Sequence, residues 1–326
     1  MRVLVTGGAG FIGFNLCKIL MHKGHEVIAL DNFITGTRTN IKKLKAYPHF
    51  SFFKHDIVKP LPSVLKQKKI NQIYHLACPT GVDNLIPLAE EMILACSIGT
   101  KNILELAKLH KAKFLFTSSS EVYGDPLVSP QKESYTGNVD SIGTRSPYEE
   151  GKRFSESITA MYQRKFKLNT RIVRIFNTYG PTMSASDTRV IPRFLNQALN
   201  GKPLTVKGKG LQRRTFCYVD DLVAGILLVM EKGRSEEVYN IGSDKEISII
   251  KLAKLILDIT KSKSTISYVV RPTHDHEMRM PDLGKVKKLG WQAKINLRRG
   301  LVKTLEEISL GEHSTNDNLM TINDNK

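Results

Sequence analysis

The first 180 residues of the chain alternate between two patterns of apolar positions. Short runs rich in β-branched and aromatic residues predict buried strands at 2–7, 25–31, 50–57, 71–77, 113–119 and 171–177. Between them, apolar residues recur at helical spacing and predict helices over 11–23, 90–110 and 147–166. Strands that alternate with helices form parallel sheets covered on both faces. The pattern therefore predicts an α/β fold with a doubly wound parallel sheet.

The pattern becomes less regular after residue 180, where shorter elements alternate with loops as far as residue 291. The run 238–243 has the composition of a strand that returns to the first sheet. We therefore expect a first domain over 1–177, with 215–245 returning to it, and a smaller α/β domain over 178–310. The last residues, 311–326, are polar and aperiodic, and we expect a mobile tail there.

Composition narrows the class of protein. A chain of 326 residues, 41% of them hydrophobic, can bury a sizeable core without disulfides or a structural metal. The four cysteines include no C-x-x-C pair, which is typical of reduced thiols, and we interpret Cys78 and Cys96 as small buried apolar residues. No apolar stretch reaches the ~18 residues of a membrane span. The strand predicted at 2–7 leaves no room for a signal peptide. We therefore expect a cytoplasmic protein that does not bind a membrane.

The formal net charge of +18 raises the question of nucleic-acid binding. The basic residues are dispersed, however, and the clusters at 42–45, 66–69 and 285–288 are typical of solvated helix faces and loop ends. We do not expect nucleic acid as a partner. A basic protein also raises the local concentration of small polyanions, so the charge favours a polyanionic substrate.

A glycine-rich segment, TGGAGFIG, lies between the first predicted strand and the first predicted helix. Gly7, Gly10 and Gly13 allow a tight turn, a close approach of backbone N–H groups to a pyrophosphate, and close packing of helix on strand. The positive end of the helix dipole would face the same phosphates. Asp31 ends the second strand 18 residues after Gly13, where a carboxylate accepts hydrogen bonds from ribose hydroxyls and repels a 2′-phosphate. The segment predicts a Rossmann-type site for NAD rather than NADP.

Tyr148 and Lys152 lie four residues apart near the start of a predicted helix, so their side chains share a face. Ser119 and Glu121 follow a buried strand at the edge where parallel sheets bind ligands. Tyrosine is a poor base at neutral pH, but a neighbouring ammonium and a positive nicotinamide ring favour the phenolate. Tyr148 would then take a proton from a sugar hydroxyl held by Ser119 while hydride leaves to NAD. A non-catalytic NAD-binding sensor would be expected to lack Ser119, Tyr148 or Lys152.

Together these motifs resemble the extended short-chain dehydrogenases/reductases, the family of nucleotide-sugar epimerases, dehydratases and decarboxylases. The resemblance runs from residue 2 to about 310 and includes RIFNTYGP and QRRTFCYVDDLV. It implies an NAD-dependent enzyme, a homodimer, and a second domain that binds a UDP-sugar. The implied cofactor-binding residues are Gly7, Gly10, Phe11, Ile12, Gly13, Asp31, Asn32, Asp56, Ile57, Leu76, Ala77, Tyr148 and Lys152. The implied catalytic residues are Ser119, Glu121, Tyr148 and Lys152, and the implied substrate-binding residues are Ser120, Asn177, Arg189, Arg214 and Arg279.

Within the family, the segment 118–153 closely resembles UDP-glucuronate decarboxylases through the pieces GDPLVSPQ, GNV, IG-x-R and Y-x-EGKR. Arg279, in EMRMPD, resembles the arginine that lies near the substrate carboxylate in those enzymes. In that reaction, oxidation at C4 makes a β-keto acid, which loses CO₂ readily before the hydride returns. NAD is therefore recycled and acts as a bound cofactor.

Three positions depart from the decarboxylase pattern. Decarboxylases usually continue His-Leu-Ala with Ser-Pro-Ala-Ser-Pro-Pro-Asn-Tyr, whereas residues 78–85 read CPTGVDNL. The usual Asn before Ile-Gly-Thr is Cys96, and the usual catalytic Thr is Ser119. The first two differences fall in the expected sugar pocket, so other sugars stay open.

Two other reactions stay open for the same residues. In a 4,6-dehydratase acting on a UDP-sugar such as UDP-N-acetylglucosamine, Glu121 would remove the C5 proton, and Ser120 stands where dehydratases commonly have Asp. A 4-epimerase would not need Glu121.

Residues 274–277, His-Asp-His-Glu, are adjacent on a predicted loop without a distant partner of suitable spacing, so we do not expect a metal site.

Overall fold

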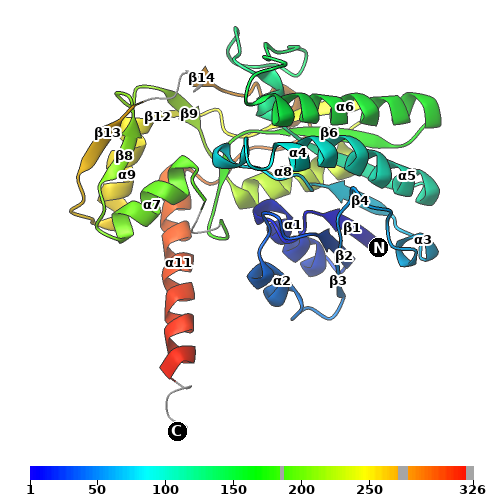
Figure 1. Ribbon diagram of the computed structural model, residues 1–326, viewed down its shortest axis with the longest axis horizontal. Helices are drawn as coiled ribbons and strands as arrows, with labels where there is room; N and C mark the ends of the chain where they lie inside the picture. The colour runs from blue at the N-terminus through cyan, green and yellow to red at the C-terminus, as the bar shows by residue number, and fades with distance from the viewer. Residues whose placement is uncertain (184–186, 271–277, 321–326) are drawn as a thin grey trace.

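The computed structural model describes residues 1–183, 187–270 and 278–320, with side chains described as far as residue 308. Its centre is a seven-stranded sheet in the order β11-β6-β5-β4-β1-β2-β3, and every neighbouring pair is parallel (Figure 1). The strands are β1 (Arg2–Thr6), β2 (Glu26–Asp31), β3 (Phe50–Lys54), β4 (Gln72–His75), β5 (Lys113–Ser119), β6 (Thr170–Ile175) and β11 (Glu237–Ile241). The predicted doubly wound α/β sheet is confirmed.

Helices cover both faces of this sheet. One face packs against α1 (Phe11–His22), α2 (Arg38–Leu44) and α8 (Val219–Lys232), and the other against α5 (Thr100–His110) and α6 (Ser146–Phe166). Strand β1 shows why both faces are covered: Val3 and Val5 belong to the apolar cluster on one face, and Leu4 belongs to the cluster on the other. Successive side chains of a strand point to opposite faces, so an uninterrupted apolar strand is buried on both.

The helix predicted over 90–110 is interrupted in the structure. It consists of α4 (Ala89–Leu94), a π-helical turn η2 (Ala95–Gly99) and α5. The hydroxyl of Ser155 donates to the Cys96 carbonyl oxygen at 2.6 Å, and that of Thr100 donates to the Ala95 carbonyl oxygen at 3.3 Å. Side chains that bond these carbonyls draw them away from regular helical pairing, which accounts for the bulge.

The remaining elements lie mostly beyond the carboxyl edge of the large sheet. Small sheets join β12 (Glu246–Ser248), β9 (Arg213–Thr215) and β14 (Met278–Arg279), then β13 (Ile266–Val269) and β8 (Leu204–Lys207), then β10 (Cys217–Tyr218) and β7 (Thr178–Tyr179). The helices are α7 (Val190–Leu199), α9 (Ile249–Thr260) and α11 (Leu297–Met320), with short turns α3 (Val64–Gln67), η1 (Val82–Asn84), η3 (Ser120–Tyr123) and α10 (Gly284–Lys288). In Figure 1, β8, β9, β12, β13 and β14 form a second lobe with α7 and α9, and α11 points away from it.

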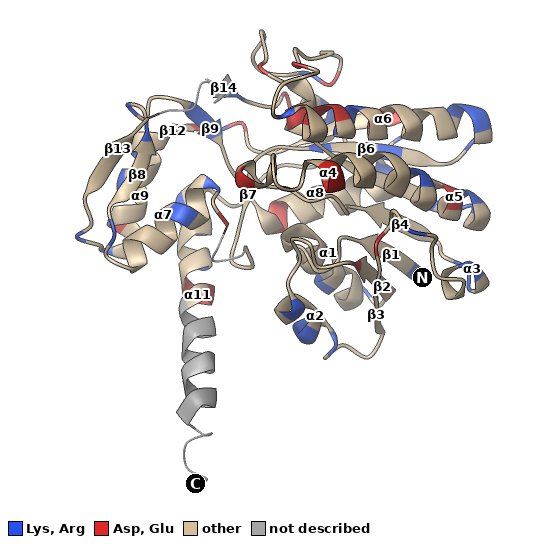
Figure 2. Cartoon of the chain, viewed as in Figure 1, with Lys and Arg blue, Asp and Glu red and all other residues tan. Residues whose placement is uncertain are grey.

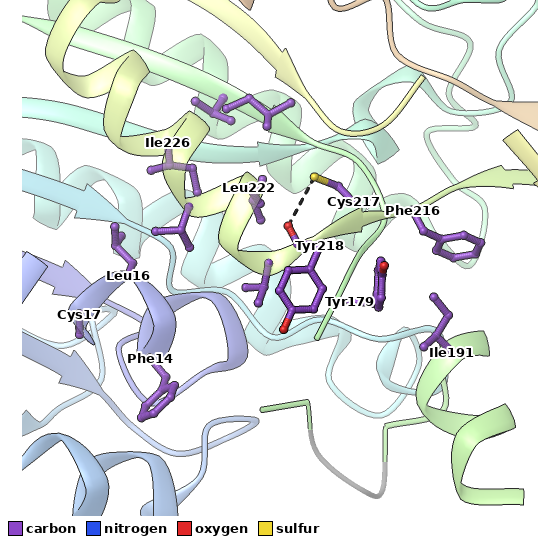
Figure 3. Packing of buried hydrophobic residues seen from close by; sticks show 14 of the residues in the cluster. Phe14, Leu16, Cys17, Tyr179, Ile191, Phe216, Cys217, Tyr218, Leu222 and Ile226 are labelled. Carbon is purple, nitrogen blue, oxygen red and sulfur yellow. Dashed lines mark hydrogen bonds between the residues drawn. The ribbon is translucent and has the colours of Figure 1, made fainter. Parts of the chain in front are cut away.

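The two lobes share one apolar core. Figure 3 shows Phe14 and Leu16 of α1 and Leu222 of α8 near Tyr179, Tyr218 and Ile191, and these residues belong to a single buried cluster. The Cys217 thiol donates to the Tyr218 carbonyl oxygen at 3.6 Å within it. A continuous core fixes the lobes relative to each other, which a site built between them requires.

Three expectations concern the rest of the chain. The backbone of 311–320 continues α11, while 321–326 lie outside the described residues, so the mobile tail expected over 311–326 stays a prediction. The segment 274–277 also lies outside them. Among the described residues, no helix combines the length and apolar character needed to span a membrane.

We predict that buried His75, at the end of β4, makes stability depend on pH. Its ring nitrogens bond the hydroxyls of Thr6 at 2.7 Å and Thr100 at 3.1 Å. Burial, and then the charge of Lys152, lowers the pKa of His75 from 6.5 to about 3. Between pH 6.5 and about pH 3, His75 binds a proton in the unfolded chain but not in the folded chain. The free energy of unfolding therefore falls as the pH falls through this range.

Urea unfolding at several pH values measures the effect. The slope of the unfolding free energy with pH should be shallower in His75→Asn than in the unchanged protein, by at most roughly 1.4 kcal/mol per pH unit. Exposed His49 gives the control, and His49→Asn should keep the original slope. Equal slopes in all three proteins would contradict the prediction.

Candidate active site

A cavity of about 800 Å³ opens where β1, β2, β4, β5 and β6 end. Its wall contains the glycine turn after β1, Asp31 at the end of β2, and the segments that follow β4, β5 and β6. Ligands of open parallel sheets bind at this edge, because the strands diverge there into loops of opposite winding. The cavity therefore has the position expected for a dinucleotide and its reaction partner.

The glycine turn has no room for side chains. Gly7 has φ +73°, and a Cβ on Gly13 would lie 2.0 Å from the Gly7 carbonyl oxygen. Helix α1 starts directly after this turn, its N-cap Gly10 makes no side-chain cap, and its first turn has no acidic residue. The N–H groups and the dipole at the start of α1 thus suit a phosphate.

The carboxylate of Asp31 is fixed in the cavity wall. One oxygen accepts from the Ala9 N–H at 3.0 Å and the other from the Phe33 N–H at 2.8 Å. Burial raises the pKa of Asp31, while these two N–H bonds oppose the rise. Asp31 thus places an acidic group beside the start of α1, where the sequence predicts the adenosine ribose.

Every predicted cofactor-binding residue lines this one cavity. They are Gly7, Gly10, Phe11, Ile12, Gly13, Asp31, Asn32, Asp56, Ile57, Leu76, Ala77, Tyr148 and Lys152. The N–H groups of Leu76 and Ala77 donate to the Thr6 hydroxyl at 3.1 and 3.2 Å, which ties the β4 end to β1. Ser118 lines the same cavity, and its hydroxyl is buried without a hydrogen-bond partner among the described residues. The glycine cradle and this unsatisfied hydroxyl both fit a bound dinucleotide.

Tyr148 and Lys152 lie in the first turns of α6, as predicted. The Lys152 ammonium donates to the Thr117 carbonyl oxygen at 3.0 Å and lies 5.8 Å from the centre of the Tyr148 ring. Burial raises the pKa of Tyr148 to about 12, although the Lys152 charge and a hydrogen bond with Ser119 act in the opposite direction. The ammonium thus favours the phenolate as expected, but burial outweighs it until a further positive charge is added.

Glu121 is shared between two arginines. Its carboxylate forms ion pairs with Arg145, just before α6, and with Arg279 of β14. Arg279 is only 4% exposed and also donates to the Gly124 carbonyl oxygen at 3.0 Å, while its Nε–H has no partner among the described residues. The structure therefore brings Arg279 from the second lobe to the end of β5.

Arg145 and Glu149 were not among the predicted site residues. Arg145 Nε donates to Glu149 at 2.9 Å while its Nη2 meets Glu121. Burial, and then the charge of Glu121, raises the pKa of Glu149 to about 7. The signal was present in the motif IG-x-R, whose last residue is Arg145, but no periodicity or spacing assigns that arginine a partner.

Four of the five predicted substrate residues line a second, adjoining cavity of about 210 Å³. Asn177 and Arg189 line both cavities, Ser120 lines the first, and Arg214 and Arg279 line the second. Arg193 and Lys207 line the second cavity as well. Lys and Arg are otherwise spread over both lobes, including α2, α6 and α7 (Figure 2). The basic residues around the second cavity suit a polyanion, because guanidinium groups pair with phosphate oxygens.

The segment that departs from the decarboxylase pattern also lies in the site. Residues 78–85 line the first cavity, and Asp83 lines both. Cys96 is buried as expected, but Cys78 is only partly buried, and its sulfur lies 3.5 Å from that of Cys96. The interpretation of Cys78 as a small buried apolar residue is wrong, because the segment after β4 forms cavity wall rather than core.

Comparison with known proteins places this site in a family. Residues 3–242 match the model of the NAD dependent epimerase/dehydratase family. UDP-glucuronic acid decarboxylase 6 of Arabidopsis thaliana is 45% identical over 95% of this chain and 89% of its own length. UDP-glucuronic acid decarboxylase 1 of Xenopus tropicalis is 43% identical over 93% of this chain and 71% of its own length.

Solved structures share the fold over almost the whole chain. The UDP-glucose 4-epimerase of Thermotoga maritima, solved with UDP-glucose, has a TM-score of 0.88 at 29% identity and covers 96% of this chain and 100% of its own. The dTDP-glucose 4,6-dehydratase DesIV of Streptomyces venezuelae, solved with NAD, has a TM-score of 0.87 at 29% identity, over 96% of this chain and 98% of its own. With the glycine cradle and the Tyr148–Lys152 pair in place, the chain belongs to the NAD-dependent epimerase/dehydratase family of enzymes.

Proposed function

We propose that this enzyme converts UDP-glucuronate to UDP-xylose by oxidation at C4, loss of CO₂ and reduction of the resulting 4-keto sugar. The observation that carries the proposal is the position of Arg279, a buried cation held at the end of β5 beside the predicted catalytic residues. A sugar carboxylate is the substrate group that such a cation would recognise. The decarboxylase names of relatives 42–45% identical to this chain support the same reaction.

In this proposal the cofactor-binding residues of the first cavity would hold NAD, which would supply the acceptor, and later the donor, of the hydride at C4 of the sugar. Tyr148 takes the proton of the C4 hydroxyl, and Ser119 orients that hydroxyl. Burial lowers the pKa of Lys152, but neighbouring groups, foremost Cys78 and Tyr148, together raise it by more, so the side chain stays an ammonium. Its charge stabilises the phenolate of Tyr148 at the moment when the proton moves.

The charges around Glu121 favour decarboxylation over dehydration. Two guanidinium groups stabilise the negative charge of Glu121, and a carboxylate so stabilised is a weaker base toward a C–H bond. A β-keto acid needs no such base, since its C–C bond breaks when CO₂ leaves. With its pKa raised to about 7, Glu149 is partly protonated at neutral pH. The two arginines together with Glu121 and Glu149 therefore keep a net positive charge, which suits a uronate.

We assign the second cavity to the UDP portion of the substrate, and its junction with the first cavity, where Glu121 lines both and pairs with Arg279, to the sugar. Asn177, Arg189 and Arg214 would hold the diphosphate, and Ser120 would contact the sugar. In domain terms, residues 1–177 with 215–245 would bind the cofactor, and 178–310 would bind mainly the nucleotide sugar.

A 4,6-dehydratase is the second candidate. It is favoured by the position of Glu121 in the sugar cavity and by the likeness to DesIV, a dTDP-glucose 4,6-dehydratase. Asp83, which lines both cavities, adds an acid that decarboxylases lack at this place. A 4-epimerase follows in third place, because it leaves Glu121 and Arg279 without a chemical role.

The substrate assay tests the proposal. We expect the protein, given UDP-glucuronate without added reductant, to form a product lighter by one CO₂ and to release labelled CO₂ from a labelled carboxyl group. UDP-N-acetylglucosamine should stay unchanged. A product of that second sugar lighter by one water, with UDP-glucuronate untouched, would replace the decarboxylase by the dehydratase.

Tyr148→Phe should lower turnover by roughly 10²–10⁴-fold, because the phenol is assigned the proton transfer. The fold and NAD binding should persist, since the phenyl ring is retained. Tyr162→Phe, on the same helix but bonded to Glu105 away from the cavity, is the matched control and should keep its turnover. Near-normal turnover in Tyr148→Phe would remove that residue from the mechanism.

Cofactor choice tests the assignment of Asp31. NAD should bind at least about tenfold more tightly than NADP, because a fixed carboxylate repels the 2′-phosphate. Asp31→Asn keeps an oxygen acceptor and removes the charge, so the preference should shrink. Asp83→Asn makes the same change elsewhere in the cavity and should leave the preference intact. Equal binding of both cofactors by the unchanged protein would refute the assignment.

We also propose a homodimer in a reducing, cytoplasmic setting. Support for the dimer comes from the exposed apolar residues Ile93, Ile98, Phe154 and Met161 on α4, η2 and α6, and support for the setting from four free thiols. Light scattering should give twice the chain mass of 36.7 kDa, and Phe154→Asp should give the monomer. Val270→Asp, which changes an exposed apolar residue of the other lobe, should leave the dimer intact. A monomer of the unchanged protein at micromolar concentration would contradict the dimer.

A further inference from the structure

Two cysteines that are 18 residues apart in the chain meet beside the first cavity. Cys78 follows β4 and lines the cavity, and Cys96 lies in the π-helical turn η2. Their sulfurs are 3.5 Å apart, and either thiol can donate to the other. The other two cysteines, Cys17 and Cys217, are buried in the apolar core and line neither cavity described above. Cys78 therefore differs from them in both its neighbouring sulfur and its position in the cavity wall.

We propose that Cys78 and Cys96 are a redox-modification site, which a small peroxide converts to an intramolecular disulfide that weakens NAD binding. The inference goes beyond the proposed function, because NAD binding and thiol content are measured without any sugar.

The surroundings of the pair favour a thiolate. The hydrogen bond from Cys78 lowers the pKa of Cys96 to about 7, burial opposes this, and the positive charge of Lys152 adds to the lowering. The same hydrogen bond, and then burial, raises the pKa of Cys78, so the proton of the pair rests on Cys78. Because either sulfur can be the donor, a shift of that proton to Cys96 across the hydrogen bond leaves the thiolate on Cys78. Cys78 then presents its reactive form to the cavity, and thiolate character with access determines susceptibility to oxidation.

The chemistry balances with a peroxide as the only co-reactant. The Cys78 thiolate attacks one peroxide oxygen, the O–O bond breaks, and a sulfenic acid forms while hydroxide leaves and is protonated to water. The Cys96 thiolate then attacks the Cys78 sulfur, the S–S bond forms, the S–O bond breaks, and a second water leaves. Two electrons pass from the sulfurs to the peroxide, and the two thiol protons end in the two waters.

Closing the bond must move one side of the pair. A disulfide brings the sulfurs to about 2.05 Å, so about 1.5 Å of the present separation has to disappear. Cys96 is held in place, because its carbonyl accepts from the Ser155 hydroxyl and its Cβ packs on Gly151 of α6, where an added Cβ would lie 3.1 Å away. The movement therefore falls on the segment that carries Cys78.

That segment is part of the cofactor wall. Ala77, next to Cys78, packs so closely on the glycine turn that a Cβ on Gly7 would lie 3.0 Å from its nitrogen. Movement of Cys78 toward Cys96 therefore also displaces Ala77 from its contact with the glycine turn, where both line the cofactor cavity. If the disulfide weakens NAD binding, thermodynamic reciprocity requires that bound NAD disfavour the disulfide by the same factor.

The first measurement counts thiols. The full chain, treated with hydrogen peroxide, denatured and alkylated, should change from four free thiols to two, and a linked peptide should join Cys78 to Cys96. Dithiothreitol should restore all four. Cys17→Ala with Cys217→Ala should still form the bond. Neither Cys78→Ser nor Cys96→Ser should form the disulfide. If Cys96→Ser does not fold, Cys78→Ser, at a residue of the cavity wall, is sufficient for the test. Four thiols after treatment, or a link to Cys17 or Cys217, would overturn the proposal.

The second measurement is NAD affinity by calorimetry on reduced and oxidised protein. Oxidation should weaken NAD binding by about tenfold or more, and dithiothreitol should reverse the loss. NAD at saturation should slow disulfide formation. In Cys78→Ser, peroxide should leave the NAD affinity as it was. Equal NAD affinities of the reduced and disulfide forms, or an equal loss in Cys78→Ser, would overturn the link between the disulfide and the cofactor.

Discussion

The carboxylate of Glu121, shared between Arg145 and Arg279, is the interaction on which the arrangement of the site depends. Three segments meet at it: the turn after β5, the loop before α6, and β14 of the second lobe. A buried guanidinium without a partner costs several kcal/mol, so Arg279 can be buried only while Glu121 is in place. The same contact that joins the lobes also brings a cation to the sugar site.

The remaining parts of the site follow from the sheet and its two cores. Parallel strands that end at one edge place Asp31, the segment after β4, and Ser119 around one cavity. The cluster that joins α1 and α8 to α7 holds the second lobe over this edge. Because this apolar cluster holds the two lobes together, the polar residues at the edge can contact a cofactor and a substrate at the same time.

Local signals were sufficient for the first part of the chain. The glycine turn, the strand that ends at Asp31, and the four-residue spacing of Tyr148 and Lys152 each express a short-range rule of backbone or helix geometry. The contact between Glu121 and Arg279 spans 158 residues and has no such signal, and Arg279 entered only by resemblance. The π-helical turn, the meeting of Cys78 with Cys96, and the burial that raises the pKa of Tyr148 to about 12 depend on packing between elements. Periodicity along the chain does not encode packing of that kind.

The central claim is that Arg279 recognises a carboxylate on the sugar. The most direct test compares the binding of UDP-glucuronate with that of UDP-glucose, which differ only in this group, by the NAD-loaded protein and by its Arg279→Ala variant. Loss of the guanidinium also releases the Glu121 carboxylate, which repels a uronate but not a neutral hexose, so the same comparison is repeated in the double variant Glu121→Gln/Arg279→Ala. The account predicts that each variant loses at least about tenfold more affinity for UDP-glucuronate than for UDP-glucose. Equal losses for the two ligands would contradict it.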